Sequence, residues 1–444
     1  MNTTPLCRNS TFVGLVLNAT VLFFGAFLSA QQSNTPLTLD AALVYARQHS
    51  PRLSAKRQGV TTEQAAIAAA RAERSPRLTL GATVRGSNQP TQTALGLPLT
   101  PLADVPEHQP FRRGHVNAEV LATIPVYTGG RISSAVSLAQ AQRDLAQVSV
   151  RDVERGLDFD VTSTYASLVQ LDRDIEAARE SVNALTESRR VVAQMLGEGK
   201  VARVDLLKVD TRLADVQDTA IEFRNAREIQ TGQFNALLGR PIDTPVIVET
   251  TLPQPSAQLS LDQVSQLAAA GNMKYQIAQA QVSVDERSVA VAKSQLRPSL
   301  SLAADLLGQS ADPFSVYKSG VIAGAVFNFP FFDRTLTHRV EEAKSRELER
   351  RAELKQAELD ASQRARSAYL QVHNAEERLR ATETAIGYAR EVLRIEQEKQ
   401  RYGRSIIENL LDAQAALLTS EARYHRALAD YTTATAAVRR ETGL

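Results

Sequence analysis

The chain has 444 residues, and its 51 lysines and arginines nearly balance its 49 aspartates and glutamates. This near-neutral charge, with basic residues spread along the chain, excludes a nucleic-acid partner bound through a basic block. The single cysteine, Cys7, excludes disulfides, thiolate metal sites and cysteine nucleophiles from the rest of the chain. Aromatic residues are only 5% and tryptophan is absent, which is typical of long helices and coiled coils.

The first 30 residues are similar to a secretory signal peptide. Arg8 precedes a mostly apolar stretch over 11–27, and Leu28-Ser29-Ala30 is a suitable cleavage site. A retained membrane anchor is the alternative, although polar residues interrupt the apolar run. Cys7 lies before this run, whereas a lipid-attachment cysteine would follow it. We therefore predict a signal peptide over residues 1–30.

The rest of the sequence repeats itself once. The Leu-Thr-Leu-Asp of residues 37–40 returns as the Leu-Ser-Leu-Asp of residues 259–262, and later matches lie 204 residues apart. A unit of this size is too long for a solenoid repeat, so we expect a duplicated block and a pseudo-symmetric structure. The first repeat spans 36–240 and the second 259–444. The proline-containing segment 241–258 between them is expected to be a linker.

Each repeat begins with two amphipathic helices that a proline ends. Pro76 and Pro298 stop the second helix of each pair, because proline cannot donate the next backbone hydrogen bond. The four helices are predicted over 38–49, 52–73, 260–271 and 274–296.

Alternation of apolar and polar residues then predicts a β-hairpin in each repeat, over about 77–127 and 299–332. In the first, Val120 and Ile124 share a face, while Glu119 points to the other side. Strands of this length cross a bilayer when tilted, but four strands cannot close and an open edge is not tolerated in lipid. Subunits must then share a barrel, of eight strands from two chains or twelve from three. Surface hairpins on a soluble protein are the alternative.

Steps of three and four residues predict long coiled-coil helices over 131–196, 202–238, 335–401 and 405–440. The longer ones extend roughly 100 Å and need partners along their length. Their seam positions recur 204 residues later, as Val161, Thr164, Leu168, Leu171, Ile175, Ala178, Val182 and Leu185 and then Ala365, Ala368, Val372, Ala375, Leu379, Thr382, Ile386 and Ala389.

The ordered set of features resembles the TolC-like outer-membrane efflux protein family, the outer membrane factors. The resemblance covers residues 36–444. It is carried by the repeated helix start, the strand-to-helix junctions at Pro125 and Pro330, Tyr402-Gly403 followed by Leu410-Leu411-Asp412-Ala413, and the endings at Gly239 and Leu444. It implies an α+β membrane protein: a homotrimer with a shared twelve-stranded β-barrel and an α-helical periplasmic tunnel.

The resemblance also implies a function. It is that of a passive exit duct in the outer membrane of a Gram-negative bacterium, extending into the periplasm as part of a tripartite efflux pump or a type I secretion system. The implied partners are a periplasmic adaptor, an inner-membrane pump of RND or ABC type, and outer-membrane lipid. A secreted periplasmic adaptor or scaffold without a barrel is one alternative. An enzyme on a coiled-coil platform is another, but the histidines are scattered and no catalytic, cofactor or metal motif is present.

The resemblance places the functional residues where the long helices reverse and where strands meet helices. At the reversal, the tyrosine and arginine that link helices in the family align with Gln400 and Ser405, so its link pattern is not reproduced. A ring of Asp412 side chains would repel one another and attract cations, or Asp412 is an ordinary solvated residue. The candidates are Asp205, Glu408, Asn409 and Asp412 for a periplasmic gate, Gly199, Lys200, Tyr402, Gly403 and Arg404 for adaptor docking, and Pro76, Pro125, Pro298 and Pro330 for the junctions.

Overall fold

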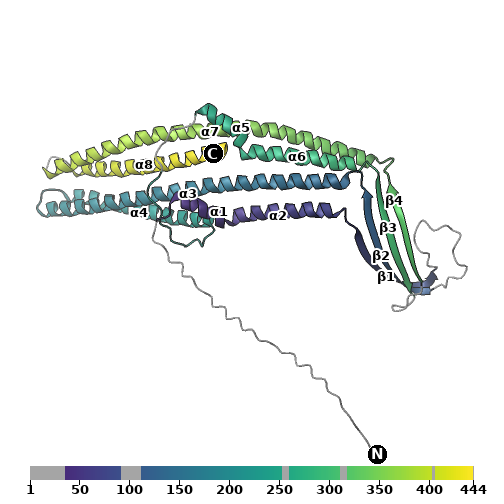
Figure 1. Ribbon diagram of the computed structural model, residues 1–444. Helices are drawn as coiled ribbons and strands as arrows, with labels where there is room; N and C mark the ends of the chain where they lie inside the picture. The colour runs from purple at the N-terminus through teal and green to yellow at the C-terminus, as the bar shows by residue number, and fades with distance from the viewer. Residues whose placement is uncertain (1–35, 92–111, 253–259, 311–317, 403–405, 444) are drawn as a thin grey trace, which may run out of the picture. The chain divides into compact units, whose positions relative to one another are not determined.

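The computed structural model describes residues 36–91, 112–252, 260–310, 318–402 and 406–443, and residues 37–444 form one unit. The predicted signal peptide lies outside the described residues. Two runs of the same elements follow each other, as Figure 1 shows. They are α1 (Leu39–His49), α2 (Pro51–Ala72), β1 (Arg77–Thr91), β2 (Arg112–Tyr127), α3 (Arg131–Gly197) and α4 (Arg203–Leu238), then α5 (Leu261–Gly271), α6 (Met273–Ser294), β3 (Ser299–Ser310), β4 (Lys318–Asn328), α7 (Arg334–Arg401) and α8 (Ile407–Thr442).

Equivalent residues start and end equivalent helices in the two repeats. Thr38 and Ser260 each accept a hydrogen bond from a first-turn backbone N–H, at 3.3 Å, and so cap α1 and α5. Gly239 and Gly443 follow α4 and α8 with φ of 72° and 84°, the left-handed conformation that glycine adopts without strain. The duplication in the sequence is therefore a duplication of local structure.

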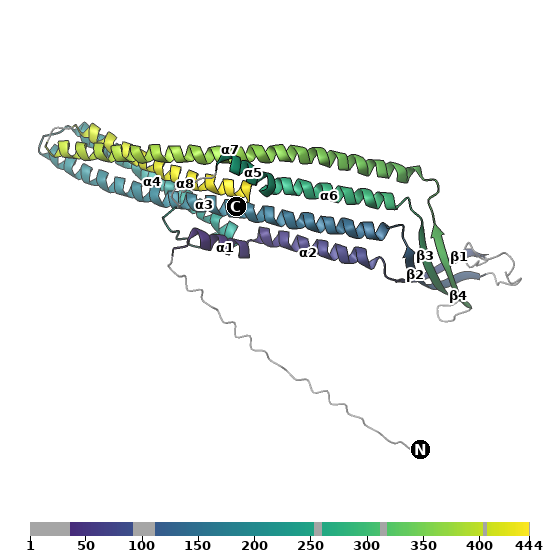
Figure 2. The same ribbon diagram turned by 45° about the horizontal axis from the view of Figure 1, so that its top comes forward.

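The long helices lie side by side in a fixed lateral order. In the half that adjoins the sheet the order is α2, α3, α6, α7, as Figure 2 shows. In the other half it is α7, α8, α3, α4, and the short helices pack beside them, α1 on α3 and α5 on α7. Helix α7 therefore forms one lateral edge along its whole length, while α2 and α4 form the other.

The main apolar core lies where α1, α3 and α4 meet the segment after α4. Tyr165 and Phe234 are buried there, with ring centroids 6.2 Å apart. The Tyr165 hydroxyl lies 3.0 Å from the Leu37 carbonyl oxygen and 3.2 Å from that of Glu249. Leu37 also forms an isolated parallel bridge with Val248. The described part of the predicted linker is thus packed against the helices.

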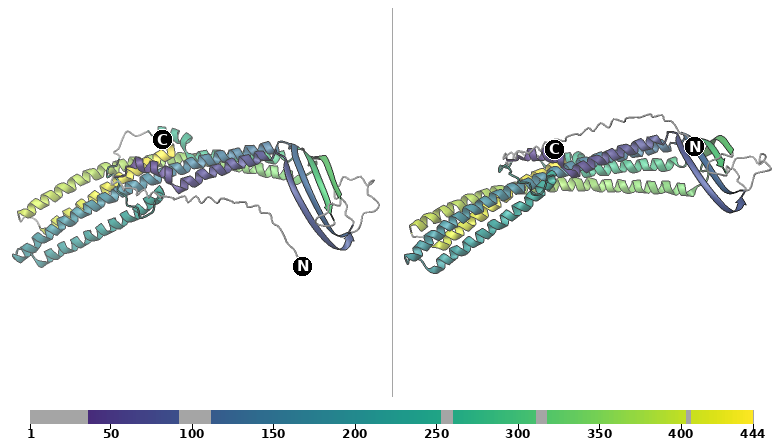
Figure 3. Two further views of the ribbon diagram at one scale, coloured as in Figure 1. Left: turned by 60° about the horizontal axis from the view of Figure 1, so that its bottom comes forward. Right: turned by 90° about the horizontal axis from the view of Figure 1, so that it is seen from below.

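One antiparallel sheet contains all four strands in the order β1-β2-β3-β4. Its central pair, β2 and β3, joins the two repeats, and Figure 3 shows all the strands leaving the helices at the same end. One face is apolar throughout the described side chains and open to solvent in the single chain, with Leu78, Leu80 and Val321 exposed by 73%, 77% and 72%. Strands β1 and β4 each leave one edge unpaired.

The long helices begin and end within two residues of the predicted positions. The second hairpin is shorter than predicted: β4 ends at Asn328 rather than near 332, because Pro330 cannot donate and the Phe331 N–H turns back to the Phe329 carbonyl, at 2.8 Å. Pro125 lies inside β2, at the irregularity in its pairing with β3. Among the described residues, no helix carries an apolar stretch long enough to cross a membrane.

Candidate functional site at the helix reversals

The two long helix pairs reverse at the end of the bundle that lies away from the sheet. The α3–α4 reversal contains Gly199, which is exposed and has a φ of 70°. Lys200 pairs there with Glu198 at 2.7 Å, and Tyr402 after α7 is 78% exposed. Gly403 and Arg404 lie outside the described residues. The described candidates for docking are therefore solvent-facing.

An ion pair connects the two reversals. The Lys208 Nζ of α4 donates to the Glu408 Oε2 of α8 at 2.8 Å. This hydrogen bond lowers the pKa of Glu408 and raises the pKa of Lys208, and the charges of Asp205 and Asp412 raise the latter further. Three of the four predicted gate residues thus surround one lysine that was not predicted.

The remaining contacts of the gate residues are local. The Asp205 carboxylate accepts a hydrogen bond from the Ala202 N–H at 3.1 Å, which satisfies a backbone donor at the start of α4. Asn409 and Asp412 are exposed, because Leu410 and Leu411 between them are the residues of this turn that face inward. Asp205 therefore has a structural role in addition to its charge, and Asp412 is available to solvent.

Apolar packing holds the helix ends together on the side of the ion pair that faces the sheet. Leu411 of α8 joins Leu185 and Val192 of α3 and Val209 of α4 in one buried cluster. Arg189 and Asp210 add an ion pair between α3 and α4, at 2.5 Å. Both reversals are therefore fixed to α3, which lies between α4 and α8.

Polar side chains interrupt the apolar α3–α8 seam, both within this cluster and farther toward the sheet. Gln414 is buried and lies 3.5 Å from the Ser188 hydroxyl, and its own side-chain oxygen has no hydrogen-bond partner. Farther along, the His425 Nδ1 lies 2.8 Å from Asp174, whose side chain is only 2% exposed. Gln170 donates to the other Asp174 oxygen at 3.3 Å. The seam between the two repeats thus contains a buried carboxylate held by a histidine.

The junction prolines do not join this site. Pro76, Pro298 and Pro330 stand beside the ends of strands, and Pro125 lies in β2, so all four belong to the sheet end. Among the described residues, no cluster of three or more histidine, cysteine or acidic side chains is placed to hold a metal ion.

Sequence profiles place this architecture in a known family. The profile described as outer membrane efflux protein matches residues 42–240 and 264–444, which are the two repeats. The chain belongs to the outer membrane efflux protein family. The family description names an efflux protein and no enzyme.

Two curated relatives of this chain share under a quarter of its residues over the aligned part. The cobalt-zinc-cadmium resistance protein CzcC of Cupriavidus metallidurans is 23% identical over 306 residues, which are 67% of this chain. Nodulation protein T of Rhizobium leguminosarum bv. trifolii is 23% identical over 308 residues, or 66% of this chain. The chain spans 64% of the length of each of these relatives.

Solved outer-membrane proteins share the fold. The CmeC outer membrane channel of Campylobacter jejuni superposes with a TM-score of 0.76 at 14% identity, covering 91% of this chain and 85% of that one. The outer membrane protein VceC of Vibrio cholerae superposes at 0.73 with 16% identity, covering 91% and 96%. These neighbours confirm the predicted fold of the single chain, long helices joined to a small β-domain.

Proposed function

We propose that the chain is a passive exit duct in the outer membrane of a Gram-negative bacterium. In this proposal three copies form one barrel and one helical tunnel, and substrates pass through it from a pump complex in the inner membrane. The duct itself supplies no energy and carries no cofactor. A periplasmic scaffold without a barrel is disfavoured, because it leaves the apolar face of the sheet without a partner.

The observation that carries the proposal is the sheet with two open edges and one apolar face. Each Leu or Val that stays fully exposed to water on such a face lacks roughly 1.5–3 kcal/mol of the free energy that its burial would contribute. Lipid removes this penalty, but the unpaired N–H and C=O groups of β1 and β4 are then intolerable unless another chain pairs with them. Both requirements are met when β4 of one copy pairs with β1 of the next.

The lateral order of the helices supports the same head-to-tail contact. Helix α7 forms the same edge as β4, and α4 lies on the edge of β1. The outer side of α7 carries exposed Leu348, Leu359, Leu370 and Val392, at intervals of eleven residues or a multiple of eleven. The outer side of α4 carries exposed Val204, Leu207, Ile221 and Ile229. Two complementary faces on opposite edges generate a closed ring when the rotation fits.

The number of copies sets what the ring encloses. Eight strands leave an interior filled by side chains, whereas twelve leave room for a passage. Transport needs the passage, so a homotrimer follows from the proposed function. The helices then continue the passage away from the membrane into the periplasm.

The reversals of the long helices form the periplasmic end of the duct in this proposal. Asp205, Glu408 and Asp412 with Lys208 are the charged groups of the gate, and Asn409 is their polar neighbour. Gly199, Lys200 and Tyr402, with Gly403 and Arg404, form the surface for a periplasmic adaptor. The adaptor connects the duct to an inner-membrane pump of RND or ABC type.

Cysteine crosslinking tests the assembly. Leu207 and Ile395 lie near the reversals on opposite edges of one chain, so a Leu207→Cys, Ile395→Cys variant can crosslink only between chains. We expect a ladder of bands that ends at a trimer in non-reducing gels of outer-membrane fractions. A Leu207→Cys, Leu370→Cys variant is the matched control, since its second cysteine lies far from the reversals on the same stripe. A ladder ending at a dimer would refute the twelve-stranded barrel.

A further inference from the structure

All four strand–helix junctions meet at one end of the sheet. The pairs Arg77↔Thr123 and Ser299↔Asn328 are the terminal pairs of the two hairpins, and Leu300 pairs with Tyr127 between them. The chain therefore brings the ends of α2 and α6 and the starts of α3 and α7 to the same level. Side chains from separate parts of the sequence form a single surface there.

Exposed aromatic side chains gather at this level. Phe331 and Phe332 are 89% and 82% exposed in the turn before α7, and Tyr127 at the end of β2 is 52% exposed. They lie next to the ends of the strands, at the point where the polar helices begin. Aromatic rings at such a boundary are typical of the zone between hydrocarbon and water.

Three exposed arginines share this level, and the described residues offer none of them an ion pair. They are Arg74 after α2, Arg77 at the start of β1, and Arg334 at the start of α7. Other junction arginines are occupied: Arg131 pairs with Glu73 at 2.8 Å, and Arg297 donates to the Gly129 carbonyl at 3.4 Å. The unpaired arginines thus remain free to bind an external anion.

The position of Arg334 is unfavourable for its own helix. It is the first residue of α7, where the helix dipole disfavours a positive charge. Asp333 next to it caps the helix by accepting from the Thr335 N–H at 2.8 Å and is not paired with Arg334. Helix stability therefore does not account for this arginine, whereas an anion outside the protein does.

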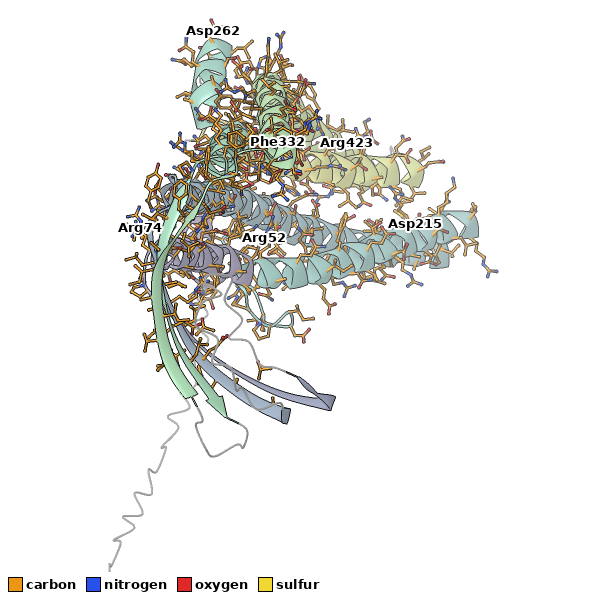
Figure 4. All side chains as sticks on the ribbon, turned by 90° about the vertical axis from the view of Figure 1, so that its right-hand side faces the viewer. Arg52, Arg74, Asp215, Asp262, Phe332 and Arg423 are labelled. Carbon is orange, nitrogen blue, oxygen red and sulfur yellow. The ribbon has the colours of Figure 1, made fainter. Side chains whose placement is uncertain are left out.

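We propose that this surface, the junction collar of Arg74, Arg77, Tyr127, Phe331, Phe332 and Arg334, binds the headgroup phosphates of anionic phospholipids. The proposal rests on the proposed function, because it assigns the collar to the membrane leaflet on the side of the long helices. Figure 4 shows Arg74 and Phe332 at the end of the sheet where the helices begin. The guanidinium groups bind phosphate oxygens, while the rings lie among the glycerol and upper acyl carbons.

Charge and apolar contact together select a bilayer lipid over a soluble anion. A free phosphate would engage the arginines but leave Phe331 and Phe332 exposed. A neutral phospholipid covers the rings but gives the three arginines no net charge to balance. Each basic residue near an anionic surface favours binding by about fivefold. We therefore expect the bound anionic lipid to be enriched over neutral lipid by at least about fivefold, the effect of one arginine.

The test uses the full chain reconstituted in vesicles of equal parts phosphatidylglycerol and phosphatidylcholine. After mild detergent extraction, the lipids that remain bound are quantified by mass spectrometry. We expect the bound lipid to be enriched in phosphatidylglycerol, and the enrichment to fall when NaCl rises from about 0.1 to 1 M. The triple variant Arg74→Gln, Arg77→Gln, Arg334→Gln should lose the enrichment.

A control variant carries the same change in charge elsewhere. Arg179, Arg366 and Arg426 are exposed on the long helices, also without an ion pair among the described residues, and their replacement by Gln should leave the enrichment intact. Replacement of the three collar arginines by Lys should retain most of it. If the Gln triple variant does not insert, the unmodified chain decides the question. An enrichment that stays the same between about 0.1 and 1 M NaCl would then overturn the collar.

The outcomes separate this inference from the proposed function. A chain that never enters vesicles contradicts the membrane duct itself. A chain that inserts but binds both lipids equally, or whose triple variant keeps the enrichment, overturns the collar alone. The triple variant can also be sedimented with purified peptidoglycan, another polyanion. If it keeps the lipid enrichment of the unmodified chain but no longer sediments with peptidoglycan, the arginines bind that polyanion and the lipid assignment is overturned.

Discussion

Lys208 and Asp412 occupy equivalent positions in the two repeats, 204 residues apart, yet they carry opposite charges. The Lys208 ammonium donates a hydrogen bond to Glu408, and the negative charge of Asp412 raises the pKa of Lys208. Equivalent residues of a duplicated chain have thus diverged into attracting partners at the end of the bundle.

The Lys208–Glu408 ion pair should hold α4 and α8 together at the reversals. Lys208→Glu should raise single-channel conductance at low voltage in planar bilayers, and adding Glu408→Lys should restore the original value. Because both side chains are exposed, the difference should shrink in about 1 M salt. Restoration by the charge swap is the decisive result, and a swapped protein that still behaves like Lys208→Glu would exclude the link.

The same ion pair should respond to acid. The folded-state pKa of Glu408 is lowered by Lys208, so the stabilisation is present above the ordinary glutamate value near pH ~4.3 and is lost as the pH falls through the lowered value. Conductance of the unmodified chain should therefore rise only in strongly acidic buffer. Glu408→Gln should remove that acid response.

Asp412 should affect ions rather than folding. Its side chain is exposed on a side of α8 that points away from the buried Leu411, so Asp412→Ala should leave assembly unchanged. We expect higher conductance at low voltage or a weaker preference for cations, measured from the reversal potential in a salt gradient. Asn409→Ala is the control, since it removes a polar group without a charge. Identical reversal potentials for Asp412→Ala and the unmodified chain would remove Asp412 from the gate.

Tyr165→Phe should weaken the core around α1. The change leaves the carbonyl oxygens of Leu37 and Glu249 without the hydroxyl donor, which costs about 1–3 kcal/mol in a buried setting. Burial raises the pKa of Tyr165 to about 12. The hydroxyl contribution is therefore complete below about pH 10 and is lost as the pH rises toward 12. Denaturant unfolding followed by circular dichroism should show both effects, and Tyr424→Phe serves as the control.

His425→Phe should destabilise the seam between the repeats strongly. It leaves the buried Asp174 carboxylate with only Gln170, and an uncompensated buried charge costs about 3–5 kcal/mol. The double variant His425→Phe, Asp174→Leu removes the charge as well and should recover most of the loss. Equal stability of the single and double variants, measured by denaturant unfolding, would contradict the pairing.

The helices and strands were predictable because the spacing of apolar residues that marks each of them lies within a short stretch of sequence. For α7 the predicted seam is also the buried one: Ala365, Val372 and Leu379 are all buried. For α3 it is only part of the answer, since α3 lies between α4 and α8 and has two seams. The second seam contains Asp174, which no heptad pattern marks as buried.

The charged partners of the candidate site were not predictable from the sequence. Lys208 meets Glu408, and Asp174 meets His425, only because the second hairpin of helices lies against the first. No local pattern encodes that contact between distant residues. The resemblance supplied the acidic positions Asp205 and Asp412 but gave no indication of Lys208, whose pKa both of them raise. The junction arginines were visible in the sequence, yet their common level depends on the strand register.

The eleven-residue spacing of the exposed apolar residues on α7 keeps them on one side of this helix. Three turns of a straight helix take about eleven residues, so Leu348, Leu359 and Leu370 stay nearly in line along the axis. Inserting one residue between Leu370 and Val392 would rotate the rest of the helix by about 100° and turn its exposed apolar side chains away from the neighbouring copy of the proposed ring. Inserting eleven would bring them back into line, though three turns farther down. In the proposed assembly, a longer or shorter helix bundle must therefore differ by steps that preserve this phase.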